Sequence, residues 1–226
     1  MKQRIIIANW KSEKSLTDAL NWMEDLSEYV QQSSSRLDEF HKKTIMLCPS
    51  FILLPSLAVA IKEHKLPIIL GSQDISSFDQ GAYTGEVNGK QMKEFIAYTL
   101  VGHSERRINF HEDNTILEQK VKQAIQNNIK PVFCVQGVDT YIPKDVSVLA
   151  YEPVFAIGTG IIDSPINAEK LANTKKKNSQ IDKVLYGGSV SEKNVIDFTS
   201  QPSIDGVLVG KASLDPISFA EIVINA

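Results

Sequence analysis

Three side chains suited to acid–base or anion-binding chemistry stand directly after apolar runs of the sequence: Lys11, His103 and Glu152. Glu152 closes the run SVLAYE ahead of Pro153, and a carboxylate at the last residue of a buried strand lies at the rim of a sheet. Glu152 is therefore a candidate general base. His103, just before a predicted helix start, is a candidate hydrogen-bond donor to a carbonyl oxygen, and Lys11 adds a formal positive charge.

Glycines follow the later apolar runs in a pattern that suits a phosphate. They occur in GTG (158–160), GGS (187–189) and VGK (209–211). Glycine lets backbone N–H groups approach a phosphate closely, and a helix that begins there adds partial positive charge. Taken singly, each of these residues would suit an ordinary turn or a solvated surface. The inference therefore depends on whether one fold brings them to the same rim.

Short apolar runs alternate with amphipathic stretches along the whole chain. Several runs, such as RIIIA, PVFCV and GVLVG, are apolar without alternation, which is typical of parallel strands covered on both faces. Apolar positions spaced by three and four after the first run predict a helix with one buried stripe. The predicted strands are 4–8, 44–48, 67–71, 98–102, 131–135, 147–151, 183–187 and 205–209, and the predicted stripe is Leu16, Leu20, Met23, Leu26 and Val30.

This order of elements predicts an α/β protein, a closed (β/α)8 barrel with residues 1–226 in a single domain. Such barrels place their active sites where the strands end and the βα loops begin, so the residues above would share one rim. An open, doubly wound sheet is the alternative, but no G-x-G-x-x-G follows the first predicted strand.

Composition narrows the function further. The 226 residues are 42% hydrophobic with a net charge of −3, so no global basic field favours nucleic acid. Cys48 and Cys134 lie in apolar runs, which indicates buried free thiols in a reducing compartment. We expect a cytoplasmic protein with no nucleic-acid partner and no membrane partner, because no apolar run has the length of a signal peptide or a membrane span.

Four longer motifs resemble those of the triosephosphate isomerase family in order and approximate spacing: GHSERRINFHEDN, AYEPVFAIGTG, LYGGSV and DGVLVGKASL. The stretch QDISSFDQGAYTGEV is similar to the family's third loop, so the resemblance covers essentially the whole chain. The resemblance implies an isomerase of a phosphorylated three-carbon sugar that works through an enediolate, with no metal and no cofactor.

The resemblance also implies a role for each residue of the rim. Glu152 is the base that removes a proton beside the carbonyl, and neutral His103 polarises the carbonyl and moves a proton between its oxygens. Lys11 and Asn9 bind the substrate and stabilise the enediolate. Glu105 supports these residues without contacting the substrate itself. The implied phosphate ligands are Gly158, Ser189, Gly210 and Lys211, and the implied lid is Pro153, Val154, Phe155, Ala156, Ile157, Gly158, Thr159 and Gly160.

A homodimer is implied as well. The segment 76–86 is long and polar for a turn, and by resemblance it docks into a neighbouring subunit beside Asn9 and Lys11. Thr84 would lie near the tip of this loop.

The chain departs from the family at several positions and in length. Lys211 replaces a usual glycine, Phe155 a lid tryptophan and Asp74 an asparagine, while CVQG lacks a usual glutamate. Only eleven residues, 136–146, separate the fifth and sixth predicted strands, close to the minimum for a parallel crossover. We expect no regular helix there, with Tyr141 and Ile142 packed against the outer wall of the barrel in an irregular loop.

Three functions remain open from the sequence. The first is isomerisation of dihydroxyacetone phosphate and glyceraldehyde 3-phosphate. The second is the same chemistry on a four-carbon ketose phosphate, favoured by the changes around Lys211 and Gln136. The third is a degenerate barrel that binds phosphosugars without turning them over. The presence of Lys11, His103 and Glu152 argues against this third function.

Overall fold

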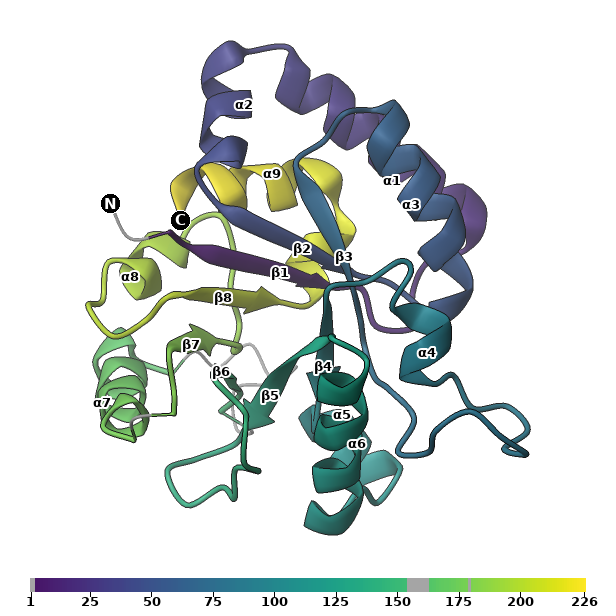
Figure 1. Ribbon diagram of the computed structural model, residues 1–226. Helices are drawn as coiled ribbons and strands as arrows, with labels where there is room; N and C mark the ends of the chain where they lie inside the picture. Colours follow the sequence, from purple (N-terminus) through teal and green to yellow (C-terminus); the bar gives the residue numbers. More distant parts are fainter. Residues whose placement is uncertain (1–2, 154–162, 179) are drawn as a thin grey trace.

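Eight parallel strands close into a barrel in the computed structural model, which describes residues 3–153, 163–178 and 180–226 (Figure 1). Each strand pairs with the next one along the chain, and β1 closes the barrel on β8, with Ile5 opposite Gly206. The predicted (β/α)8 fold is confirmed, and each strand lies within one residue of its predicted bounds. The strands are β1 (Ile5–Asn9), β2 (Thr44–Cys48), β3 (Ile68–Ser72), β4 (Tyr98–Val101), β5 (Lys130–Val135), β6 (Val148–Tyr151), β7 (Lys183–Tyr186) and β8 (Gly206–Val209).

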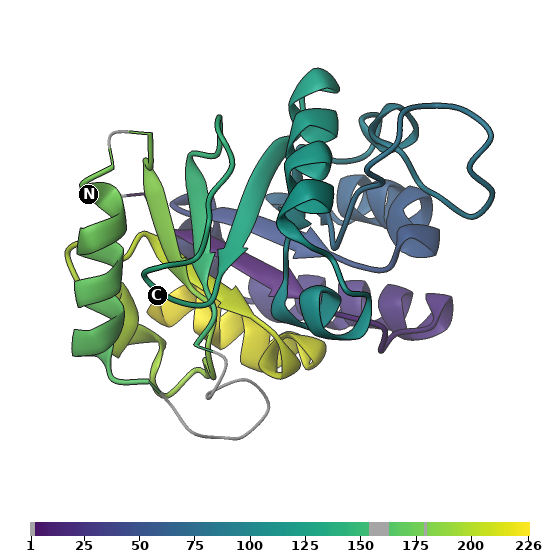
Figure 2. The ribbon, with the colours of Figure 1, turned by 90° about the horizontal axis from the view of Figure 1, so that it is seen from below.

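Helices surround the barrel (Figures 1 and 2). Side chains of Ser15, Asp113, Ser164 and Asp215 accept a backbone hydrogen bond at the start of four of these helices, as expected of N-cap residues. The helical elements are α1 (Leu16–Gln31), α2 (Ser34–His41), η1 (Phe51–Leu53), α3 (Leu54–Glu63), α4 (Gly89–Met92), α5 (Ser104–Asn109), α6 (Asn114–Gln126), α7 (Pro165–Lys176), α8 (Val195–Thr199), η3 (Lys211–Leu214) and α9 (Pro216–Asn225).

Apart from Ile69 on β3 and Lys130 on β5, the strand residues are buried or half-buried on both faces, as their continuous apolar runs predict. Along β1, Ile5 and Ile7 belong to a cluster drawn from alternate strand positions, which fills the barrel interior. Ile6 and Ala8 belong to a larger cluster between the outer wall of the barrel and the helices. The two-residue alternation of each strand therefore decides which side chains face the barrel axis.

The buried stripe of α1 differs from the predicted one. Met23, Leu26 and Val30 are buried as predicted, but Leu16 and Leu20 are 47% and 40% exposed. Ala19 and Trp22 take their places in the contact with the barrel, because they lie on the same helix face as Met23 and Leu26. Hydrophobicity alone does not indicate that a small alanine and a large tryptophan belong to the same buried stripe.

The segment that connects β5 to β6 contains no helix, as expected (Figures 1 and 2). Ile142 packs against the outer core cluster, which confirms half of the expected packing. The other half is wrong. Tyr141 is 44% exposed, and its hydroxyl donates a hydrogen bond to Glu118 on α6 (3.0 Å). The side chain of Tyr141 is therefore bound to a helix and is not buried against the barrel wall.

On its other side this connecting segment is bound to α7. The buried Lys175 donates hydrogen bonds from Nζ to the carbonyl oxygens of Val138 (2.8 Å) and Thr140 (3.3 Å). Polar contacts with the two flanking helices therefore replace the helix that an ordinary barrel would place here.

Candidate active site

Asn9 and Glu152 reach the mouth of the barrel because they continue the inward-facing positions of their strands. Ile7 on β1 and Ala150 on β6 lie in the interior cluster, and Asn9 and Glu152 follow them at the two-residue step of a strand. Both side chains are buried, with 5% of Asn9 and 1% of Glu152 exposed. An amide and a carboxylate are thus presented at the carboxyl ends of β1 and β6, where the sequence places them.

His103 is the N-cap residue of α5, and this position determines which ring nitrogen accepts a hydrogen bond from the backbone. Nδ1 accepts a hydrogen bond from the backbone N–H of Glu105 (3.2 Å), so the proton of the neutral ring lies on Nε2. Nε2 lies 2.9 Å from Oε1 of Glu152, and the backbone N–H of Ser104 donates to Oε2 of the same carboxylate (3.0 Å). The first turn of α5 therefore fixes the orientation of the His103 ring and of the buried carboxylate beside it.

Lys11 follows β1, and its side chain extends past Gly210, the residue after β8, toward Glu105. Its backbone is left-handed, with φ 51°, and its Nζ forms an ion pair with Glu105. A Cβ placed on Gly210 would lie 3.7 Å from Cε of Lys11, so the lysine stem passes close to the start of η3. The ammonium group is thereby held next to the helix that His103 caps. The structure thus brings together Lys11, His103, Glu105 and Glu152 as the sequence predicts.

The remaining residues predicted to bind phosphate follow β7 and β8. Gly210 accepts hydrogen bonds at its carbonyl oxygen from the backbone N–H (2.9 Å) and the hydroxyl (2.7 Å) of Ser213, which turns the chain into η3. Lys211, the first residue of η3, is exposed. The backbone carbonyl of Ser189 accepts a hydrogen bond from Asn194 Nδ2 (3.0 Å). Backbone N–H groups at the start of a helical turn, such as that of Lys211 at η3, suit an anion.

Gly187 leaves space for the carboxylate. A Cβ at this position would lie 3.2 Å from Cγ of Glu152 and 3.2 Å from the carbonyl oxygen of Tyr151. Since these contacts are tighter than an ordinary van der Waals contact, a larger residue would displace Glu152 or the end of β6. The glycine after β7 therefore leaves room for the Glu152 side chain and also lies beside the predicted phosphate site.

Two tryptophans anchor η3, and sequence reasoning did not find this role. The indole Nε1 atoms of Trp10 and Trp22 each donate a hydrogen bond to the carbonyl oxygen of Ser213, both at 3.2 Å. Their rings are buried and meet edge to face, with centroids 4.9 Å apart. The residue between Asn9 and Lys11 thus ties the loop after β1 to the loop after β8. No sequence pattern marks a contact between residues this far apart in the chain.

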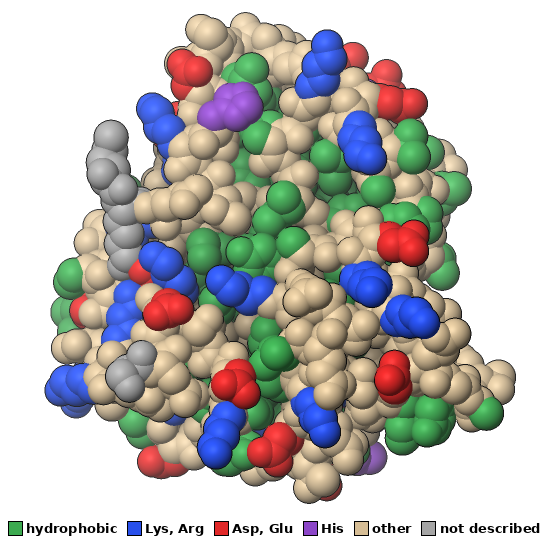
Figure 3. All heavy atoms as spheres, viewed as in Figure 1, with side chains coloured by type: hydrophobic (Ala, Val, Ile, Leu, Met, Phe, Trp, Pro, Cys, Tyr) green, Lys and Arg blue, Asp and Glu red, His purple; other side chains and the backbone are tan. Residues whose placement is uncertain are grey.

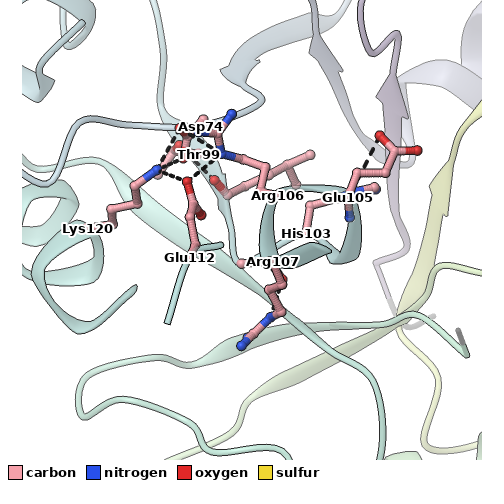
Figure 4. A network of polar contacts seen from close by, with 10 residues as sticks. Asp74, Thr99, His103, Glu105, Arg106, Arg107, Glu112 and Lys120 are labelled. Atoms are coloured by element: carbon pink, nitrogen blue, oxygen red, sulfur yellow. Dashed lines mark hydrogen bonds and ion pairs between the residues drawn. The ribbon is translucent and has the colours of Figure 1, made fainter. Parts of the chain in front are cut away.

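A cluster of four charged side chains, from here on the ion cluster, lies beside α5 (Figure 4). Lys120 Nζ contacts Asp74 Oδ1 (2.6 Å) and Glu112 Oε1 (2.5 Å), and Arg106 Nε contacts Asp74 Oδ2 (2.9 Å) and Glu112 Oε1 (2.6 Å). Burial raises the pKa of Asp74, and the positive charge of Lys120 offsets part of this shift. The aspartate that departs from the family pattern is thus paired with two cations at the base of the loop after β3.

Cys134, on β5, lies close to Glu152 in the barrel interior. Burial raises the pKa of this thiol, and the neighbouring Glu152 carboxylate raises it further. Cys134 therefore stays protonated and uncharged beside the Glu152 carboxylate. Burial likewise raises the pKa of Cys48 to about 12, so neither cysteine is a reactive thiolate.

Part of the predicted site lies outside the described residues, namely Val154 to Gly160 of the lid, Gly158 with them. Pro153 is described and is buried directly after Glu152. In the described ranges 3–153, 163–178 and 180–226, no three His, Cys, Asp or Glu side chains are grouped so that they could hold a metal ion. None of the helices described is both long enough and apolar enough to span a membrane.

Comparison with known proteins gives one consistent result. The family model described as triosephosphate isomerase matches residues 4–145 and 137–226. The chain is 35% identical to a triosephosphate isomerase of Mesomycoplasma hyopneumoniae strain 7448, over 99% of this chain and all of the relative. It is also 35% identical to triosephosphate isomerases of Polynucleobacter asymbioticus (98% of this chain, 99% of the relative) and Dictyoglomus thermophilum (99% of each). These alignments extend over 246 to 257 positions, more than the 226 residues of this chain, in line with the short connection after β5.

Proposed function

The chain belongs to the triosephosphate isomerase family, and from this premise we propose how its own residues carry out the reaction. The enzyme interconverts dihydroxyacetone phosphate and glyceraldehyde 3-phosphate. In this reaction a proton leaves the carbon next to the carbonyl, an enediolate forms, and a proton returns to the neighbouring carbon. The chain must therefore supply a base, a polarising donor, and groups that bind the phosphate.

Glu152 is the base. It is almost completely buried, and its two oxygens meet the Nε2 of His103 and the backbone N–H of Ser104. These contacts hold the carboxylate at the mouth of the barrel, where it can reach a bound substrate. On substrate binding, Glu152 takes the proton from one carbon and later delivers it to the other.

His103 polarises the substrate carbonyl. Its neutral ring carries a proton on Nε2, because Nδ1 is occupied by the backbone N–H of Glu105. A neutral donor can give a hydrogen bond to the oxygen that becomes negative and can move a proton between the two oxygens of the enediolate. The cap position at α5 therefore sets the histidine's chemical role.

Lys11 and Asn9 complete the anion-binding side. Lys11 spans from Gly210 to Glu105, so its ammonium lies between the proposed phosphate-binding loop and the proposed reacting carbons. Asn9 holds the loop after β1, which carries Lys11, by accepting a hydrogen bond from the Lys11 backbone N–H (3.1 Å). The phosphate is bound by backbone N–H groups of Ser189, Gly210 and Lys211, and the exposed ammonium of Lys211 adds attraction at longer range.

We further propose a cytoplasmic, single-domain enzyme that acts as a homodimer. The pairing of β1 with β8 brings the two ends of the chain into one barrel, which supports a single domain. Both cysteines are buried free thiols, which supports a reducing compartment such as the cytoplasm. Residues 76–86 lie in a loop that extends away from the barrel (Figures 1 and 2). Its aromatic pair, Phe78 and Tyr83, is stacked at 4.2 Å yet nearly half exposed, which suits burial against a second copy.

The observation that carries this assignment is the contact between Glu152 and His103 at 2.9 Å, with Lys11 anchored beside them. The test is an assay of the purified protein with dihydroxyacetone phosphate and, separately, with a four-carbon ketose phosphate. We expect turnover of the three-carbon substrate and a much lower kcat/KM for the four-carbon one. Preference for the four-carbon phosphate, or binding of both without turnover, would contradict the assignment.

A further inference from the structure

The backbone of Lys11 adopts a conformation that a lysine does not favour. Its φ of 51° is in the left-handed region, where the Cβ of an L-residue crowds the backbone. Such a residue persists only where surrounding contacts hold it in place. The question is which groups hold Lys11.

Three polar side chains hold the peptide groups of Lys11. Asn9 Oδ1 accepts from its N–H (3.1 Å), and its carbonyl oxygen accepts from Gln73 Nε2 (2.7 Å) and from Ser50 Oγ (3.3 Å). The contact with Gln73 is the shortest of the three. It is also the only one of them supplied from the loop after β3.

Gln73 binds two strand ends with one amide group. Besides the carbonyl oxygen of Lys11, its Nε2 donates to the carbonyl oxygen of Cys48, the last residue of β2 (2.9 Å). Both partners are acceptors only, so the two N–H bonds of the amide are required and a carboxylate could not replace them. Cys48 O also accepts from the backbone N–H of Trp10 (3.1 Å), which joins Lys11's own loop to the same point.

The position of Gln73 is itself fixed on both sides. Before it, the buried hydroxyl of Ser72 is hydrogen-bonded to Thr99 on β4 (2.8 Å). After it, Asp74 is held in the ion cluster by Lys120 and Arg106 (Figure 4). The amide of Gln73 is thus presented from a rigid base to a strained backbone at the edge of the active site.

We propose that Gln73 is a positioning residue for catalysis, which acts through Lys11. By holding the Lys11 carbonyl it keeps the left-handed backbone that aims the lysine stem past Gly210 toward Glu105. This inference rests on the proposed role of Lys11 in substrate binding. It assigns Gln73 no contact with the substrate.

The test is a double-mutant cycle of Gln73→Glu with Lys11→Met, measured as kcat/KM for dihydroxyacetone phosphate. Gln73→Glu keeps the size of the side chain but turns an oxygen toward two carbonyl oxygens. We expect it to lower kcat/KM about tenfold or more, chiefly through a higher KM, because a displaced ammonium binds the substrate less well. In the Lys11→Met background the same change should lower kcat/KM less than about twofold.

Three controls make the result decisive. Gln119→Glu makes the same chemical change at an exposed position of α6 and should leave kcat/KM at the wild-type value. Thermal unfolding reports the fold of each variant, and Gln73→Met replaces Gln73→Glu in the cycle if the latter fails to fold. Wild-type turnover is measured first, since its absence would contradict the proposed function itself. With an active wild type, equal losses from the Gln73 substitution in both backgrounds, or no loss at all, would overturn the positioning role.

Discussion

At the scale of single residues, the mouth of the barrel contains side chains that are proposed to contact the substrate and others that hold those side chains in place. Glu152 and His103 meet each other directly, whereas Glu105 contacts both Lys11 and the ring of His103. Lys11 is involved in both kinds of contact. Its ammonium is proposed to bind the substrate, while its strained, left-handed backbone must itself be held by neighbouring side chains. The charge of Lys11 can therefore be tested apart from its stem.

Removing the charge of Lys11 while keeping its stem should leave the fold intact and impair the reaction. Lys11→Met retains the aliphatic contact near Gly210 and loses the ammonium that stabilises developing negative charge. Loss of one such donor typically lowers kcat by about 10²–10³-fold. Steady-state kinetics with dihydroxyacetone phosphate checks this, with Lys122→Met on the exposed side of α6 as the matched control. A kcat/KM within threefold of wild type would remove Lys11 from the mechanism.

The residues proposed to do chemistry stand out in the sequence, but the residues that hold them do not. Lys11, His103 and Glu152 are charged or titratable groups at the ends of apolar runs, and that position is visible in one dimension. Gln73, Trp10 and Trp22 act through hydrogen bonds to backbone carbonyls of distant segments. Every segment of the chain has backbone carbonyl groups, so no residue pattern indicates which of them accepts the hydrogen bond.

At the scale of elements, strands were easier to predict than helices. The strands are buried on both faces, so their runs are continuously apolar and bounded within one residue. Helix α1 buries only one face, and Leu16 and Leu20 lie at the edge of that face where they remain exposed. The short helix α2 lacks a strong apolar repeat, with only Phe40 buried, and was not predicted.

The connection between β5 and β6 shows how a barrel survives the loss of a helix. Lys175 on α7 binds two carbonyl groups of the connection, and Tyr141 donates a hydrogen bond to Glu118 on α6. Ile142 and the fully buried Val146 supply apolar contacts. The active-site residues described above lie at strand ends that this connection does not form, apart from Glu152 after β6. We therefore expect the connection to govern stability rather than turnover.

Substitution of Ile142 and Tyr141 separately tests this division. Ile142→Ser removes a packed apolar side chain and should lower the free energy of unfolding by about 1–3 kcal/mol. Tyr141→Ser loses one exposed hydrogen bond and should cost under about 1 kcal/mol. Urea unfolding measures both, and turnover per folded molecule should stay at the wild-type value. If Tyr141→Ser is the more destabilising of the two, the packing described here is wrong.

At the scale of the whole molecule, charge is spread rather than gathered. Figure 3 shows lysine and arginine interspersed with aspartate and glutamate over one face, with hydrophobic side chains between them. The net charge of −3 is correspondingly small. The feature that points to a macromolecular partner is the loop 76–86, with its exposed stacked aromatic pair.

A charged residue near the tip of this loop should break the proposed dimer. Thr84 is exposed in the isolated chain, and by the proposal it is buried beside Asn9 and Lys11 of a second copy. Thr84→Arg should give a monomer in sedimentation at micromolar concentration, with turnover lowered about tenfold or more, because burying an unpaired charge is costly. Ile196→Arg, at an exposed position of α8, is the matched control and should remain a dimer. A fully active wild-type monomer would rule out this assembly.

The central claim, that Glu152 transfers the proton between substrate carbons, is tested most directly by isomerisation in deuterated water followed by NMR. The wild-type enzyme should introduce deuterium at the carbon that receives the proton, because a proton held on a carboxylate exchanges with solvent. Glu152→Gln should lower turnover by about 10²–10⁴-fold with unchanged thermal unfolding, while Glu94→Gln at an exposed position should match the wild type. Wild-type turnover in Glu152→Gln would contradict the account, whereas product molecules without deuterium are those that received the substrate's own proton from the carboxylate before it exchanged.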